Sequence, residues 1–159
     1  MKFILSLALL LTLAACEVQE TKDENKNNVV NETDYTVCHS SGNYPSNPIG
    51  SWQIFQTQNG FHFRKIYRIT NDSFFLTHQC DFGNGAKASA SVGVQSSVVY
   101  NGISLLSSAK NAQSVTRDGY ELKCQAELSP GVIKYRLEGR CLVLSDEAGS
   151  EELALVPVE

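Results

Sequence analysis

The stretch FHFRKIYRI, residues 61–69, alternates apolar and polar side chains with a period of two. Alternation of this kind predicts an antiparallel strand with one face in a core and the other in solvent. Lys65 is the exception, because it falls on the otherwise apolar face. The predicted inner face carries Phe61, Phe63, Tyr67 and Ile69, and the outer face carries His62, Arg64 and Arg68.

The same alternation recurs in YELKCQAEL, residues 120–128, and turn dipeptides such as Asp118-Gly119 separate the strands along the chain. Asn-Gly and Asp-Gly pairs favour tight hairpins because they adopt the positive φ angles that such turns need. No stretch shows a convincing helical spacing of apolar residues. The pattern therefore predicts an all-β fold, an antiparallel up-and-down meander that closes into a small barrel of about eight to ten strands.

One predicted strand is unusual because its side chains are small. The run AKASASVGVQSS, residues 86–97, would place Ala86, Ala88, Ala90, Val92 and Val94 on the inner face. Small inward side chains would leave room inside the barrel for a ligand. The alternative is a filled core, since a barrel of eight strands is narrow enough for its own side chains to fill it.

The N-terminus carries an export signal. Met1-Lys2 precedes an uncharged run from Phe3 to Ala15, which is too short to span a bilayer and fits the core of a signal peptide. Leu13-Ala14-Ala15-Cys16 at its end resembles the lipobox of bacterial lipoproteins. This resemblance implies cleavage before Cys16, a diacylglyceryl thioether on its sulfur and acylation of the new N-terminus, which together hold a protein on a membrane.

The predicted organisation is a signal peptide over residues 1–15, a lipidated cysteine with a disordered tether over 16–34, and a barrel domain over 35–159. The tether is predicted from its composition, because a segment rich in Glu, Asp, Asn and Lys buries too little apolar surface to fold. Glu17 follows the cysteine where the enterobacterial pattern uses Asp to retain lipoproteins in the inner membrane. The predicted location is therefore the outer membrane of a bacterial envelope.

The chain has five cysteines, and lipidation of Cys16 leaves an even set for disulfides in an oxidising compartment. Four cysteines allow three pairings. We favour Cys80–Cys124, which would join two predicted strands, and Cys38–Cys141, which would fasten the segment before the barrel to its wall. The other two pairings stay open at this point.

The barrel domain resembles the small lipocalin-like domains of bacterial lipoproteins over about residues 48–157. Gly50-Ser51-Trp52 matches the Gly-x-Trp that opens their first strand, and Tyr135 to Gly139 matches a Tyr-x-x-x-Gly hairpin near their end. The resemblance implies a closed barrel, with Trp52 either as a structural plug at its bottom or as a ligand contact. The candidate ligand-binding residues are Trp52, Phe61, Phe63, Tyr67 and Phe74.

Other classes of function find little support. The net charge of −4 argues against nucleic acid as a partner. No nucleophile motif is present, so the chain is not predicted to be an enzyme and no cofactor is expected. His39 and His78 lie close in sequence to Cys38 and Cys80, but oxidised cysteines do not bind metal, and no metal site is predicted.

The sequence therefore predicts a monomeric, membrane-anchored envelope lipoprotein that binds or shields a small apolar ligand. One alternative is a protein-interaction module such as an inhibitor of an envelope hydrolase, because Ser41-Gly42-Asn43-Tyr44 is similar to the Ser-Gly-x-x-Tyr loop of lipoprotein lysozyme inhibitors, one residue shorter. Another is a structural envelope protein without a ligand. The basic stripe of His62, Arg64 and Arg68 is either a solvated strand face or a contact for an anionic partner.

Overall fold

The computed structural model describes residues 35–39, 42, 44–58, 60–83 and 85–158. Predictions for the signal peptide, for Cys16 and for the tether fall outside these ranges and stay predictions. No helix among the described residues has the length and apolarity needed to cross a membrane. A single 3₁₀ turn, η1 (Tyr35–His39), precedes ten strands: β1 (Gly50–Gln58), β2 (Phe61–Ile69), β3 (Ser73–Asp81), β4 (Lys87–Val99), β5 (Gly102–Leu105), β6 (Ala109–Arg117), β7 (Tyr120–Leu128), β8 (Gly131–Glu138), β9 (Cys141–Ser145) and β10 (Glu152–Pro157).

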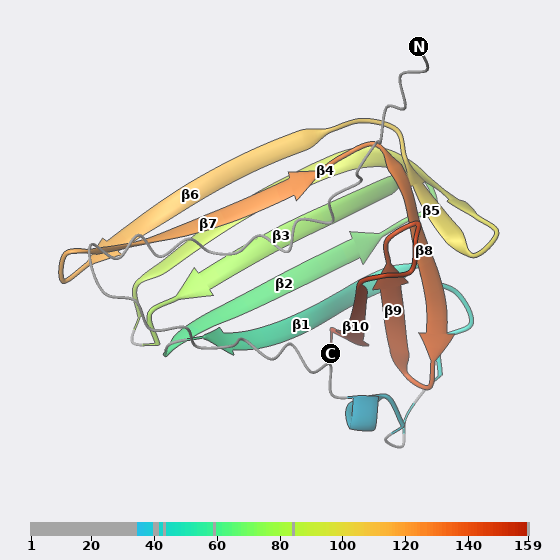
Figure 1. Ribbon diagram of the computed structural model, residues 1–159, viewed down its shortest axis with the longest axis horizontal. Coiled ribbons are helices and arrows are strands. Elements are labelled where there is room, and N and C mark those ends of the chain that lie inside the picture. Colours follow the sequence, from blue (N-terminus) through green and yellow to red (C-terminus); the bar gives the residue numbers. More distant parts are fainter. Residues whose placement is uncertain (1–34, 40–41, 43, 59, 84, 159) are drawn as a thin grey trace, which may run out of the picture.

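Eight of these strands form a closed barrel in the order β1-β10-β9-β8-β5-β4-β3-β2 (Figure 1). Every neighbouring pair is antiparallel, which confirms the predicted all-β barrel. The Gly-x-Trp segment opens β1, and Gly139 lies in the turn between β8 and β9, as expected from the two matched motifs.

The hairpin of β6 and β7 departs from a simple meander. It lies between β5 and β8 in sequence, but those two strands pair directly, and the hairpin forms a separate two-stranded sheet. Asp118 and Gly119 close it with φ angles of 49° and 83°, the positive values that a tight hairpin turn needs. The barrel is therefore an eight-stranded meander with one hairpin inserted outside the ring.

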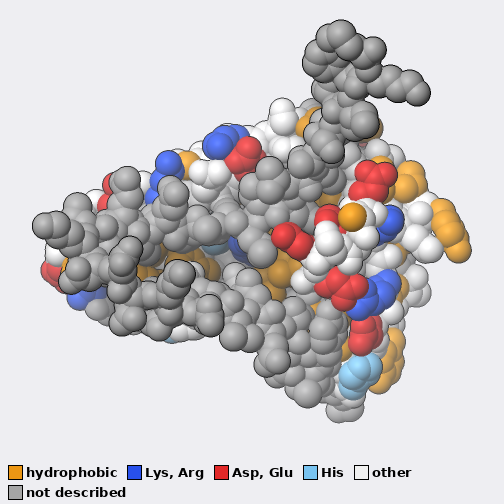
Figure 2. All heavy atoms as spheres, in the orientation of Figure 1, with side chains coloured by type: hydrophobic (Ala, Val, Ile, Leu, Met, Phe, Trp, Pro, Cys, Tyr) orange, Lys and Arg blue, Asp and Glu red, His pale blue; other side chains and the backbone are white. Residues whose placement is uncertain are grey.

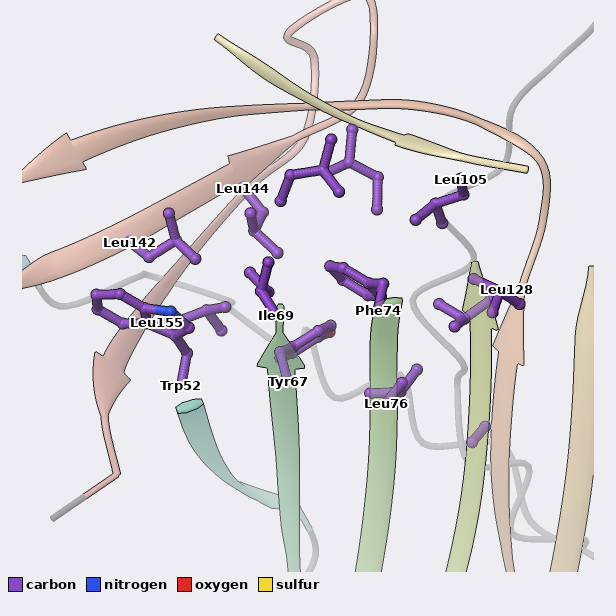
Figure 3. Close-up of a cluster of buried hydrophobic side chains, with 14 of the residues drawn as sticks. Trp52, Tyr67, Ile69, Phe74, Leu76, Leu105, Leu128, Leu142, Leu144 and Leu155 are labelled. Carbon is purple, nitrogen blue, oxygen red and sulfur yellow. The ribbon is translucent and has the colours of Figure 1, made fainter. Parts of the chain in front are cut away.

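The closed part of the barrel has one apolar core. Its buried side chains come from every strand of the ring and from the end of β7, and Figure 3 shows those of β1, β2, β3 and β9 converging on the axis. This arrangement matches the filled-core alternative for the closed part. The core comprises Trp52, Tyr67, Ile69, Phe74, Leu76, Ala90, Val94, Ile103, Leu105, Ala126, Leu128, Ile133, Leu142, Leu144 and Leu155.

β4 has two roles along its length. Its last residues, Ser96 to Val99, pair with β5 in the ring, whereas Lys87 to Gln95 pair only with β3. β6 lies beside β4 along residues 87–95. There, Asn111 Nδ2 of β6 donates a hydrogen bond to the carbonyl oxygen of Ser91 at 3.1 Å. β7 in turn packs against β4 and β3 (Figure 1).

The small side chains of β4 face inward as predicted, with Ala88, Ala90 and Val94 buried. The space beside them is not left empty, because the inner face of β7 occupies it. Leu122 and Cys124 of β7 pack with Ala88 in a second buried cluster that also holds Phe63 and Cys80. Small residues on β4 therefore allow the hairpin to approach closely, and β7 takes the room that one of the two predicted alternatives gave to a ligand.

Two disulfides fasten the parts of the fold together, and both predicted pairings are confirmed. Cys80–Cys124 joins β3 to β7, and Cys38–Cys141 joins η1 to β9. The second bridge packs with Val143 and Ala154 in a third buried cluster. A native bridge in a small secreted domain typically contributes about 2–5 kcal/mol to stability.

Candidate ligand site

The five residues predicted to bind a ligand all lie on β1, β2 and β3, but they do not form one group. Trp52, Tyr67 and Phe74 belong to the barrel core, whereas Phe63 belongs to the cluster under the hairpin and Phe61 packs against that cluster. Four of them are buried, and Phe61 is half-buried. The structure therefore divides the predicted site between a filled core and a second, less enclosed region.

Trp52 fits the structural role better than ligand contact. Its indole Nε1 donates a hydrogen bond to the carbonyl oxygen of Pro48 at 2.8 Å, and Pro48 is itself buried. A buried indole with its one donor satisfied by the backbone fixes the entry to β1. Figure 3 shows its ring beside Leu155, in the layer where β1 meets β10.

Tyr67 and Phe74 also belong to the barrel packing. Their rings meet edge to face with centroids 6.0 Å apart. Burial raises the pKa of the Tyr67 phenol well above its ordinary range, because the phenolate cannot be solvated there. These two side chains therefore act as core residues.

The second region carries two buried ionisable side chains, Lys65 and His78. They are direct cross-strand partners on the inner faces of β2 and β3. His78 Nδ1 lies 2.9 Å from the carbonyl oxygen of Gln125 on β7, which fixes the imidazole under the hairpin. Burial lowers the pKa of His78, and the positive charge of Lys65 lowers it further, against the hydrogen bond to Gln125, which raises it.

The Cys80–Cys124 disulfide lies directly beside His78. Cys80 Sγ is 3.9 Å from His78 Nε2, and Cys124 Sγ is 3.1 Å from the carbonyl oxygen of His78. All three side chains are buried. Sequence analysis noted His78 near Cys80 but missed this cluster. Residues 78 and 80 are two apart on one predicted strand, so their side chains point to the same face. Together with the favoured Cys80–Cys124 pairing, this spacing places His78 beside the disulfide.

One side of this region lacks the hairpin. β7 packs on β3 and β4, and the inner faces of β1 and β2 lie farther from it (Figure 1). Ile54, Phe61 and Phe82 are half-buried there, and the Phe61 and Phe82 rings meet edge to face with centroids 5.3 Å apart. Hydrophobic side chains are visible between the hairpin and β1 in Figure 2. We call this region, made of half-buried Ile54, Phe61 and Phe82 with buried Phe63 and Lys65 beneath them, the open-side surface.

The predicted basic stripe lies on the outer face of β2, where its arginines have neighbours on the adjoining strands. The Arg64 guanidinium lies 5.2 Å from the ring centroid of exposed Phe55 and donates to Gln53 Oε1. The Arg68 guanidinium lies 5.7 Å from the Phe75 ring centroid. Cross-strand stacking of this kind is typical of a solvated sheet face.

The loop that was compared with lysozyme inhibitors is described only at Gly42 and Tyr44. Tyr44 is exposed, and a Cβ on Gly42 would meet the guanidinium of Arg140 at 3.5 Å. Ser41 and Asn43 lie outside the described residues. The alternative of a lysozyme inhibitor stays a prediction.

No protein-family model, curated protein or solved structure matches this chain.

Proposed function

We propose that the protein is a lipid-anchored lipoprotein of the bacterial envelope, with a lipocalin-like barrel that binds a small, mainly apolar ligand carrying one anionic head group. The ligand lies on the open-side surface, not inside the closed barrel. The observation that carries this proposal is Lys65, an ammonium group on the inner face of β2, where the other inward side chains are aromatic or aliphatic. Binding sites for small molecules combine an apolar lining with a few placed polar groups in this way.

The side chains around Lys65 indicate which chemical class of ligand would bind. Phe63 and Tyr67 flank it along β2, and Phe61 and Ile54 offer half-buried apolar surface nearby. An alkyl chain on this surface would remove apolar area from water, at about 25 cal/mol per Å². A carboxylate at its end would pair with the Lys65 ammonium, and charge-assisted hydrogen bonds of this type contribute about 1.5–3 kcal/mol.

The affinity for a long-chain carboxylate tests this proposal. We expect the full-length protein to bind a fluorescent long-chain fatty acid, and Lys65→Met to weaken that binding by about tenfold or more, since about 1.4 kcal/mol corresponds to tenfold. Methionine keeps the length and apolar character of the lysine stem. The methyl ester of the same probe should bind both proteins equally well.

Lys123→Met is the matched control, because it makes the same substitution at an exposed position of β7. This variant should bind the carboxylate as the wild type does. Absence of binding to the wild type, or equal losses in the two variants, would refute the proposed ligand class.

The anchor is tested separately. The lipobox resemblance supports acylation at Cys16, so Cys16→Ser should abolish incorporation of labelled palmitate and release the protein from the membrane fraction. Continued labelling of this variant would contradict the anchor and leave the ligand proposal untouched.

A further inference from the structure

We propose that reduction of the Cys80–Cys124 disulfide converts the cluster with His78 into a three-coordinate site for one Cu⁺ ion. The ligands are the two cysteine sulfurs and His78 Nε2. These three donor atoms already lie within 4.8 Å of one another. The site is independent of the ligand proposed for the open-side surface.

A backbone hydrogen bond fixes the tautomer of His78. Its Nδ1 lies 2.9 Å from the carbonyl oxygen of Gln125, and a carbonyl only accepts hydrogen bonds. Nδ1 therefore carries the proton and donates it. Nε2 is left with its lone pair, directed toward Cys80 Sγ at 3.9 Å. A backbone carbonyl that fixes a histidine tautomer in this way is the usual outer support of a metal-binding imidazole.

Each sulfur atom of the pair has an acceptor beside it. Cys80 Sγ lies 3.9 Å from His78 Nε2, and Cys124 Sγ lies 3.1 Å from the carbonyl oxygen of His78. A disulfide sulfur has no proton to donate, but after reduction each thiol could donate to its acceptor. The surroundings therefore accommodate the reduced cysteines as well as the disulfide.

The spacing and the kind of donor atoms favour Cu⁺. Metal bonds to nitrogen and sulfur of about 2.0–2.3 Å place the donor atoms of a trigonal site roughly 3.5–4 Å apart. The 3.9 Å between Cys80 Sγ and His78 Nε2 fits this spacing, and the two sulfurs need to separate once their bond is broken. Thiolates select soft ions such as Cu⁺. A structural Zn²⁺ site usually needs a fourth ligand.

Reduction of the disulfide comes before metal binding. A dithiol reductant transfers two electrons and two protons, the S–S bond breaks to give two thiols, and the reductant becomes a disulfide. Cu⁺ then binds as the two thiol protons leave, and the copper keeps its oxidation state. The hairpin that carries Cys124 must move away from β3 to admit the reductant, because both sulfurs are buried.

The second disulfide provides an internal contrast. His39 follows Cys38, but its imidazole is exposed and pairs with Glu138 Oε1 at 3.6 Å. Cys38 and Cys141 therefore have no imidazole directed at them by the backbone. Copper binding should follow the first pair of cysteines and not the second.

The test is an anaerobic titration with Cu⁺ against a competing chelator, after reduction with dithiothreitol and its removal. All proteins are full-length and carry Cys16→Ser, which removes the remaining thiol. We expect one equivalent of Cu⁺ to bind only after reduction, and X-ray absorption to show two sulfur ligands and one nitrogen ligand. Cys38→Ser/Cys141→Ser and His39→Gln should bind as the parent does.

Cys80→Ser/Cys124→Ser should lose the site, and His78→Gln should bind at least about tenfold more weakly, since loss even of a ligand's outer support costs that much. Equal binding by the two double variants would overturn the proposal. So would binding by His78→Gln at parental affinity. The X-ray absorption of the parent gives an independent answer if a variant fails to fold, because a site without nitrogen also contradicts the assignment.

Discussion

The phenol of Tyr67 lies in the barrel core, where burial raises its pKa above the ordinary value of 10.0. Above pH 10 the unfolded chain loses this proton while the folded chain keeps it. The free energy of unfolding should therefore fall as the pH rises above about 10. Urea denaturation at a series of alkaline pH values measures this fall.

Tyr67→Phe removes the titrating group and should flatten that part of the pH profile. Tyr120→Phe is the control, because Tyr120 is exposed on β7, and this variant should retain the decline that Tyr67 causes. A Tyr67→Phe protein with the wild-type alkaline profile would show that this phenol does not remain protonated in the fold.

Gly139 is a second residue whose environment dictates its identity. Its φ is 57°, and a Cβ there would lie 2.0 Å from the carbonyl oxygen of Cys38. Arg140 N donates to that same oxygen at 2.8 Å, which holds η1 against the β8–β9 turn. Gly139→Ala should therefore lower the free energy of unfolding by clearly more than the 1–2 kcal/mol or so that a left-handed conformation alone costs.

Gly119→Ala separates the two effects, because Gly119 also has a positive φ, 83°, but open space around its Cβ position. This variant should lose only about 1–2 kcal/mol in the same urea experiment. Equal losses at the two positions would mean that the contact with Cys38 contributes nothing.

At the scale of elements, the hairpin of β6 and β7 depends on the small inner residues of β4. Ala90→Leu should destabilise the fold by about 1–3 kcal/mol, because the added side chain must displace packed neighbours in the core. Ser89→Leu, one residue earlier on the outer face of the same strand, should change stability by no more than about 0.5 kcal/mol. Thermal unfolding of both variants makes the comparison, and similar melting temperatures would contradict the packing of β7 on β4.

The strands themselves follow from sequence, and the place of this hairpin does not. Period-two alternation identifies the inner face of β2, including Lys65 as its exception, and the inner face of β7. Alternation states which side chains point inward but not which strand lies opposite them. The partner of the small face of β4 was therefore unpredictable, because an alanine leaves room for a ligand or for another strand equally well.

The residues of the candidate site could be predicted from the sequence, but their arrangement could not. The aromatic residues of β2 were placed on the inner face, but their division between a filled core and an open side depends on where β7 packs. The Cys80–Cys124 pairing could be favoured because both cysteines fall in predicted strands, and the structure confirms it. The contact of His78 with the Gln125 carbonyl depends on a backbone position that side-chain patterns do not encode.

At the scale of the whole molecule, the barrel is closed and filled at one end and extended by a sheet and hairpin at the other (Figure 1). The charged side chains of Arg136, Glu138 and Glu152 cluster on the outside of β8 and β10, away from the open-side surface. Two disulfides fasten the chain at η1 and at β7, so both additions to the ring are covalently attached. The central claim is that a ligand binds on the extended end and leaves the closed core undisturbed.

The measurement that tests this claim most directly is the amide NMR spectrum of the protein with and without a long-chain carboxylate. We predict shift changes in β1 and β2 around Ile54, Phe61 and Lys65, with amides of the barrel core such as Ile103 and Leu142 unchanged. Changes centred on the core amides, or no changes at saturating carboxylate, would contradict the account.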